Sequence, residues 1–98
     1  MSTTAASIDI DAFRAGLARD GFSGPEDRSL PSAPRGGTHT HPFEVRGLML
    51  DGAFTVTVDG VATTYRPGEV FTMAPGCAHA EEVGPEGARY LVGRKHGA

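Results

Sequence analysis

The chain has 98 residues, enough for one domain with a modest hydrophobic core. Its 12 acidic and 9 basic residues give a net charge of -3 and are spread along the chain, so no basic block suggests a nucleic-acid partner. The single cysteine, Cys77, excludes a disulfide within the chain and fits a reducing compartment.

The sequence has no apolar run that approaches the length of a membrane span, so no membrane partner is expected. The first residues, MSTTAASIDIDAF, carry Asp9 and Asp11 where a signal peptide has an apolar stretch, and they lack a basic start. We therefore expect a cytoplasmic protein.

Residues 11–20, DAFRAGLARD, are predicted to form a short helix. Asp11 is suited to cap its start, Phe13 and Leu17 lie one turn apart on one face, and Gly21 is suited to end it. The next segment, GFSGPEDRSLPSAPRGG, is rich in Gly, Pro and Ser, which predicts a connector with at most a short strand around residues 27–30. We expect residues 1–35 to pack as helix and connector on a barrel core formed by residues 36–98, all within a single domain.

Strand signals dominate from His39 onward. In FTVTVDG, Phe54, Val56 and Val58 alternate with polar residues, which predicts that these three side chains face the core while the threonines are more exposed. The pairs Asp51-Gly52 and Asp59-Gly60 are typical of two-residue hairpin turns, and Pro67-Gly68 is typical of another tight turn. The segments EVFTM and ARYLVGR predict two more short strands. Frequent turns with no helical pattern between them indicate a small antiparallel barrel or sandwich.

Three of the four histidines lie at the predicted starts of strands. His39 and His41 are two residues apart, so on a strand they project from the same face and can bind one cation. Two polar histidines at the start of a strand are the alternative interpretation of this pair. His79 follows a Pro-Gly turn far downstream, where a barrel can bring it across to the first two. His96 lies in a polar tail and is expected to be solvated.

The run GGTHTHPFEVRGLMLDG resembles the first sequence motif of the cupins, and YRPGEVFTMAPGCAHAE resembles the second. The resemblance covers about residues 36–94, and within this range the chain is most similar to a small single-domain cupin. It implies an all-β fold, the cupin double-stranded β-helix (jelly-roll) barrel with a metal held inside near one end, here preceded by a short N-terminal helix. By position, the family's histidine ligands correspond to His39, His41 and His79.

The family's glutamate ligand has no clean match. Its usual position falls on Val45 or Arg46, whereas Glu44 comes one residue early and, by strand parity, points away from the histidines. A bulge at Pro42 would reset that parity and turn Glu44 inward. Glu81 shares the face of His79 by parity and is a candidate fourth ligand. Cys77 belongs to the turn, where we expect a buried, inert thiol.

Three neutral imidazoles favour a divalent ion such as zinc, nickel, iron or manganese, with a position left open for water or substrate. Two functions follow from the resemblance: a metal-dependent enzyme (dioxygenase, isomerase or lyase) acting on a small molecule, or a non-catalytic module that binds or senses a small ligand. No catalytic residue is assigned at this stage. Candidates for the apolar packing around the site are Phe43, Val45, Met49, Phe54, Val56 and Phe71.

Assembly is predicted from the outer face of the barrel. By parity this face carries Leu48 and Leu50 beside Arg46, an apolar patch of a kind that a second subunit often covers. We therefore expect a homodimer.

Overall fold

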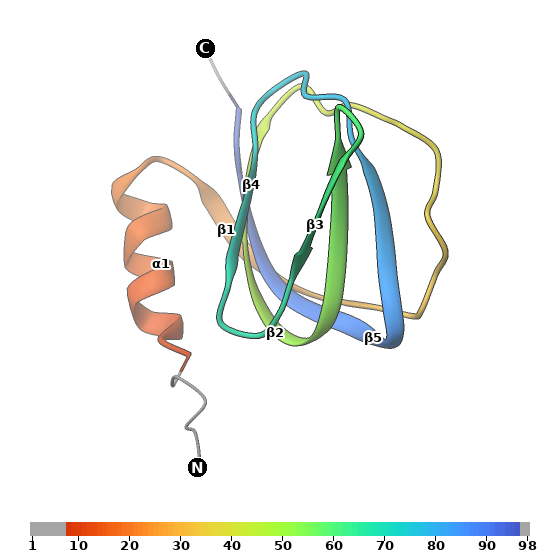
Figure 1. Ribbon diagram of the computed structural model, residues 1–98. Coiled ribbons are helices and arrows are strands. Elements are labelled where there is room, and N and C mark those ends of the chain that lie inside the picture. The colour runs from red at the N-terminus through yellow and green to blue at the C-terminus, as the bar shows by residue number, and fades with distance from the viewer. Residues whose placement is uncertain (1–7, 97–98) are drawn as a thin grey trace.

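The computed structural model describes residues 8–96. Residues 1–7, which make up most of the segment considered above as a signal peptide, lie outside the described residues. One helix precedes a set of antiparallel strands that wrap into a barrel, as predicted (Figure 1). In chain order the elements are α1 (Ile10–Arg19), β1 (Ser23–Leu30), β2 (Glu44–Val58), β3 (Val61–Tyr65), β4 (Val70–Met73) and β5 (Ala80–Lys95).

The two long strands β2 and β5 form the frame of the barrel. They pair with each other along nearly their whole length, from Glu44 opposite Lys95 to Thr57 opposite Ala80. The free side of β2 pairs first with β4 and then with β3, while β1 pairs with the second half of β5. Because both long strands bend, their side chains on one face enclose a common interior.

The interior face follows the predicted alternation. Phe54 and Val56 are 1% and 6% exposed, whereas Thr55 and Thr57 are half-buried. Val58 is half-buried and packs against the same cluster. Burying a large apolar side chain of this kind stabilises the fold by about 1.5–3 kcal/mol. The buried members of the inner cluster are Val45, Met49, Phe54, Val56, Phe71, Met73, Val83, Ala88, Tyr90 and Val92.

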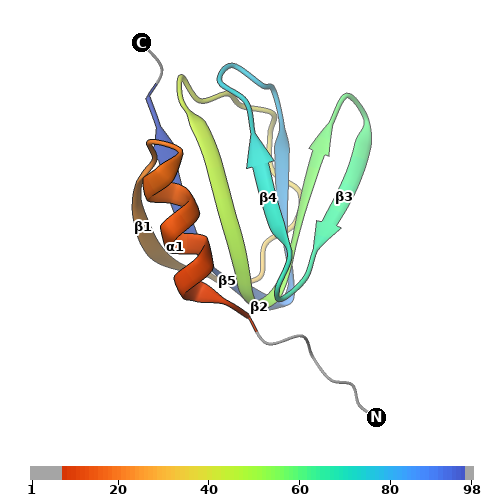
Figure 2. The same cartoon turned by 90° about the vertical axis from the view of Figure 1, so that its left-hand side faces the viewer.

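Only one of the two Asp-Gly pairs forms a hairpin. Asp59 and Gly60 have φ values of 51° and 79° and connect β2 to β3 directly, as predicted. The hairpin predicted at Asp51-Gly52 is wrong, because these residues lie inside β2, where the register with β5 shifts on either side of them. Gly52 has φ 76°, so a residue without a side chain supplies a bulge and a bend instead of a chain reversal. Figure 2 shows the two arms of β2 joined at this bend.

The connector after the helix holds more regular structure than its composition predicts. β1 begins at Ser23, and it pairs with β5 from Ser23 opposite Arg94 to Leu30 opposite Ala88. Its side chains are mostly exposed, so no alternating apolar pattern marks it as a strand. Residues 31–43 then run as a long segment around the barrel before β2 begins (Figure 1).

Helix α1 covers the outer apolar face of the barrel. Its cap is Asp9, whose side chain accepts a hydrogen bond from the Ala12 amide, so the helix begins one residue earlier than predicted and Asp11 lies in its first turn. Leu17 packs on Leu48, which is 4% exposed, and Leu50 packs partly on the same cluster. The interpretation of this patch as a subunit contact is therefore wrong, since the chain covers it with its own helix. The homodimer stays a prediction, but the apolar patch no longer supports it.

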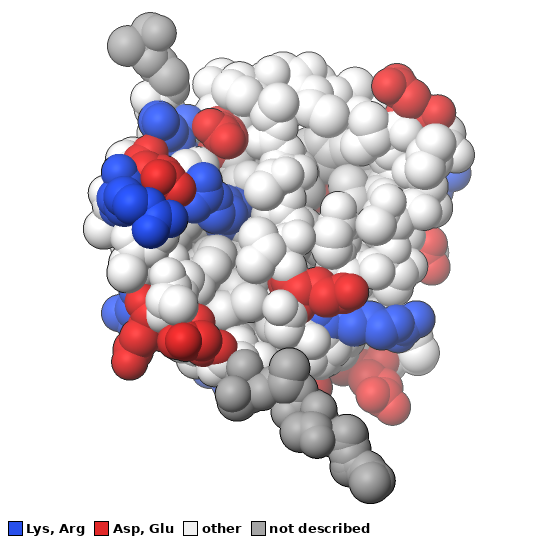
Figure 3. All heavy atoms as spheres, turned by 60° about the vertical axis from the view of Figure 1, so that its left-hand side comes forward, with Lys and Arg blue, Asp and Glu red and all other residues white. Residues whose placement is uncertain are grey.

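An ion pair ties the end of α1 to the barrel. Arg46 on β2 donates a hydrogen bond of 2.7 Å to Asp20, and its guanidinium lies 4.4 Å from the centre of the Phe22 ring. Basic and acidic side chains lie beside one another on this face (Figure 3). The hydrogen bonds from Arg46 and then Arg19 lower the pKa of Asp20 below its ordinary value of 3.8.

Replacing Asp20 with asparagine should lower the melting temperature modestly at pH 7 and leave it unchanged in strong acid. Because the pKa of Asp20 is lower in the folded chain, its stabilisation is complete above about pH 4 and is lost as the pH falls from 3.8 through the folded value. Thermal unfolding of both proteins between pH 2 and pH 7 measures this. Glu82→Gln is the control, because Glu82 is exposed and makes no ion pair within residues 8–96. A difference of constant size at every pH would contradict the assignment.

Among residues 8–96, no helix combines the length and the apolar character that crossing a membrane requires.

Candidate metal centre

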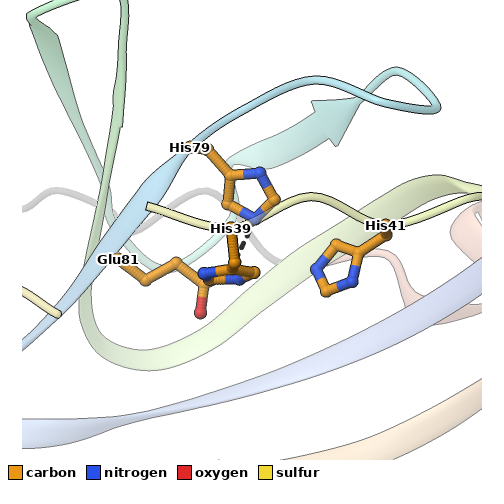
Figure 4. Close-up of side chains that lie close together, drawn as sticks. All are labelled: His39, His41, His79 and Glu81. Atoms are coloured by element: carbon orange, nitrogen blue, oxygen red, sulfur yellow. Dashed lines mark hydrogen bonds and ion pairs between the residues drawn. The ribbon is translucent and has the colours of Figure 1, made fainter. Parts of the chain in front are cut away.

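Three histidines from two distant segments of the chain lie together (Figure 4). The ring centres of His39 and His79 are 4.4 Å apart, and that of His41 lies 5.1 Å from each of the others. His39 and His41 precede β2 instead of starting it, but their extended backbone still places the two rings side by side. Their alternative role, as two unrelated polar side chains, does not explain why His79 meets them.

The backbone fixes the distance between two of these residues. His39 and His79 form an isolated antiparallel bridge, with hydrogen bonds of 2.9 and 3.0 Å between their amides and carbonyls. The turn Ala74–Cys77 leads into His79, and Gly76, with φ 75°, takes the left-handed conformation that this turn requires. The side chain of His79 is 1% exposed, whereas His41 is half-buried and His39 is exposed.

Glu81 completes the cluster from β5, two residues after His79. One of its oxygens, Oε2, lies 3.2 Å from Nε2 of His79 and 3.6 Å from Nε2 of His39. The geometry therefore agrees with the prediction that Glu81 and His79 project from the same face of the strand. Glu44, in contrast, is not part of the cluster, and it is the neighbouring Val45 that lines the cavity beside the histidines. The inward turn of Glu44 that a bulge at Pro42 would produce is therefore not found.

The hydrogen bonds of the two rings determine which nitrogen carries the proton. Nδ1 of His79 lies 2.9 Å from the carbonyl oxygen of Cys77, and Nδ1 of His39 lies 3.3 Å from that of Gly37. A carbonyl only accepts, so Nδ1 is the protonated nitrogen of each neutral ring and Nε2 bears a lone pair. Both lone pairs then meet the same carboxylate oxygen of Glu81. A metal ion among these three atoms could accept all of their lone pairs, whereas a ring proton on one Nε2 could satisfy one of them.

The spacing of the donor atoms fits one metal ion. The ligand atoms of the four residues all lie within 4.8 Å of one another. Nitrogen and oxygen ligands lie about 2.0–2.2 Å from a transition-metal ion, so two ligands of one ion are at most about 4.4 Å apart. Small side-chain movements bring the four atoms within that limit. Metal-binding histidines typically donate their other ring nitrogen to a backbone carbonyl, as His39 and His79 do here.

The remaining histidines and the cysteine differ in burial. Burial lowers the pKa of His41 below its ordinary value of 6.5, and the adjacent His79 and His39 lower it further, so its ring is neutral at pH 7. Cys77 lies outside the cluster, and it is half-buried where a buried thiol was predicted. His96 is exposed, with its ring 5.1 Å from that of Phe43.

The cluster opens into a cavity of about 120 Å³ inside the barrel. Phe43, Val45, Phe54 and Phe71 line it as four of the apolar candidates expected there, whereas Met49 and Val56 fill the core elsewhere. Its other lining residues are Arg28, His39, His41, Met73, Glu81, Tyr90, Val92 and Arg94.

Sequence reasoning missed the polar residues of this cavity: Tyr90, Arg28 and Arg94. Tyr90 and Arg94 lie on alternate positions of β5, and Arg28 pairs directly with Tyr90 across the β1–β5 ladder. The alternation along ARYLVGR was a usable signal for the two β5 residues, but the register of β1 has no sequence signature. Burial raises the pKa of the Tyr90 phenol above its ordinary value of 10, and the charge of Glu81 raises it further. The phenol is therefore protonated at neutral pH.

Similar structures have the same fold. A conserved protein of unknown function from Streptococcus pyogenes superposes with a TM-score of 0.64 and 22% identity, over 74% of this chain and 62% of its own. DMSP lyase DddQ from Ruegeria pomeroyi gives 0.61 and 21%, over 70% and 36%. A predicted oxalate decarboxylase from Thermotoga maritima gives 0.63 and 18%, over 83% and 72%. The chain thus spans less than two thirds of the first two proteins.

No curated protein matches the chain in sequence. The model of the cupin domain matches residues 28–92, which is more than half of the chain and includes all four residues of the cluster. The barrel, the two sequence motifs and this match agree with one another. The chain belongs to the cupin family and has the jelly-roll barrel of that family.

Proposed function

We propose that His39, His41, His79 and Glu81 hold a divalent metal ion, and that the protein is a metal-dependent enzyme acting on a small molecule in the adjoining cavity. The observation that carries the proposal is the convergence of the four ligand atoms within 4.8 Å of one another, with both Nε2 atoms beside one oxygen of Glu81 at 3.2 and 3.6 Å. A divalent ion placed among these atoms would be bound by both rings and by the carboxylate. The ion would be zinc, nickel, iron or manganese, since imidazole and carboxylate ligands suit each of these.

The residues of this chain have separate roles in the proposed chemistry. A bound ion would supply Lewis acidity toward an oxygen of the substrate. The carbonyls of Cys77 and Gly37 orient two of the ligand rings, and the backbone bridge holds those rings together. Tyr90 presents a protonated phenol to the cavity and can donate a hydrogen bond to a bound molecule. The aromatic walls, Phe43, Phe54 and Phe71, exclude water from the reacting atoms.

Two of the similar proteins support an enzyme over a passive module, because one is a lyase and another a predicted decarboxylase. A non-catalytic sensor remains the second function consistent with the family. Metal analysis of the purified protein tests the first half of the proposal, and we expect about one divalent ion for each chain. Product formation from small molecules, followed by NMR with and without a chelator, tests the second half. A metal-loaded protein that binds a molecule and never converts it would be a sensor.

Replacing Glu81 with glutamine should lower the affinity for the metal ion by about 10-fold to 100-fold, because a neutral amide replaces the only charged ligand. Isothermal titration with Zn²⁺ or Mn²⁺ measures the change. Glu44→Gln is the matched control, since Glu44 lies nearby at the start of β2 but outside the cluster. Equal losses in the two variants would show that Glu81 acts only through the general charge of the protein.

A further inference from the structure

Two arginines line the same cavity as the histidine cluster. Arg28 lies on β1 directly opposite Tyr90, and Arg94 lies on β5 four residues after Tyr90. The guanidinium of Arg94 stacks 5.3 Å from the centre of the Phe43 ring, and Phe43 in turn stacks on His41. Both arginines thus belong to the wall of the cavity, and Arg94 adjoins the proposed ligand His41 through Phe43.

The donors of both guanidiniums are largely unused. Each arginine has a long ion pair with Glu26, at 3.8 Å for Arg28 and 3.6 Å for Arg94. Within residues 8–96, neither side chain donates a hydrogen bond to a protein acceptor. Arg89, on the same strand but outside the cavity, instead donates two to Asp27. A guanidinium carries five donors in a planar fork that matches a carboxylate, so both arginines can bind an anion.

The charges in the cavity also favour an anion. Glu81 is its only acidic lining residue, against the two arginines. A divalent ion at the histidine cluster would raise the positive charge further. Positive charge between walls of low polarity concentrates anions.

The size of the cavity limits the rest of the ligand. A volume of about 120 Å³ holds roughly four water molecules, so the part of the ligand inside the cavity has only a few carbon atoms. Val45, Met73 and Val92 line it together with the aromatic rings and suit a short apolar body.

We propose that the cavity binds a short-chain carboxylate, whose carboxylate group lies between the guanidiniums of Arg28 and Arg94 and the metal ion. The inference rests on the proposed function for its metal ion, while the arginines supply the recognition of charge. Tyr90 donates a further hydrogen bond from the cavity wall. Glu26 competes for both guanidiniums from outside.

Propionate is the probe, and propionamide is its neutral match in shape. In the Mn²⁺-loaded protein, we expect the relaxation of propionate protons to increase strongly on binding, and propionamide to bind at least about 10-fold more weakly because it lacks the charge. Arg94→Met and Arg28→Met should each weaken propionate binding by about 10-fold without changing Mn²⁺ affinity. Arg94→Lys should restore part of the loss. Arg89→Met is the control and should have no effect.

Glu26→Gln gives an independent measurement. Freeing both guanidiniums should tighten propionate binding, whereas ion pairs with a purely structural role would leave it unchanged or weaken it. Propionate binding that equals propionamide binding, or that survives both arginine-to-methionine changes, would overturn the carboxylate inference even with Mn²⁺ in place. If the parent protein takes up no metal, the proposed function fails, and saturation-transfer NMR on the metal-free protein then decides the inference by the same contrast.

Discussion

Replacing His41 with alanine should lower the affinity for a divalent metal ion by at least about 100-fold, because loss of a ligand exceeds the 10-fold to 100-fold effect typical of the groups that merely orient ligands. His41 is the most informative of the three histidines to change. Its side chain is half-buried and stacks on Phe43, whereas His79 is fully buried and hydrogen bonded to a backbone carbonyl. The fold should therefore survive the change. Isothermal titration with Zn²⁺ or Mn²⁺ measures the affinity, and circular dichroism checks the barrel.

His96→Ala is the matched control for this experiment, because His96 is the fourth histidine of the chain and lies outside the cluster. Its replacement should leave metal affinity within about twofold of the parent value, a change well under the 1.4 kcal/mol that a tenfold effect represents. An ion that stays bound in His41→Ala and leaves in His96→Ala would place the metal site elsewhere.

Replacing Gly52 with alanine should destabilise the barrel by about 3 kcal/mol or more, the sum of two separate costs. Gly52 has φ 76°, where a side chain strains the backbone, and an added Cβ would overlap the carbonyl oxygen of Gly87 on the facing strand. A backbone atom cannot turn aside as a flexible side chain can, so the bend between the arms of β2 must open. For a domain of this size, the melting temperature should fall by about 12 °C or more.

Gly60→Ala separates the two costs. Gly60 has φ 79°, yet an added Cβ meets nothing within 4 Å, so only the conformational strain of about 1 kcal/mol applies. Urea unfolding of the two variants compares them directly. A loss in Gly52→Ala no larger than that in Gly60→Ala would show that the bulge relaxes to admit a side chain.

The sequence predicted the parts of the fold that depend on local pattern. Alternation at Phe54 and Val56 gave the buried face of β2, and Asp59-Gly60 gave its hairpin. Asp51-Gly52 carries the same local signal, but long-range pairing of β2 with β5 continues on both sides of it and converts the turn into a bulge and a bend within one strand. β1 was underestimated for a related reason, since its stability comes from the ladder with β5 and not from its own composition.

The residues of the candidate site likewise divide into those that a local pattern predicts and those that depend on long-range pairing. The spacing of His39 and His41, and the Pro-Gly turn before His79, sufficed to single out three residues of the cluster. Glu81 could be named only as one of two candidate acids, because parity favoured it over Glu44 but a bulge at Pro42 would have reversed the parity of Glu44. The arginines of the cavity depend on the register between β1 and β5 and on the shape of the interior. Neither is encoded in a short motif.

The bridge between His39 and His79 has a consequence for when a metal ion would enter. Its two backbone hydrogen bonds bring the ligand pair together as part of the barrel, so the entropy of joining distant segments is lost during folding and not during metal uptake. In small domains that lack a hydrophobic core and are held together by a bound metal ion, folding and metal binding occur together. This chain has a separate core of its own. Its newly made polypeptide is therefore expected to fold without the ion, so that an ion bound at the proposed site would reflect the metals available in the cell and could be exchanged during the protein's lifetime.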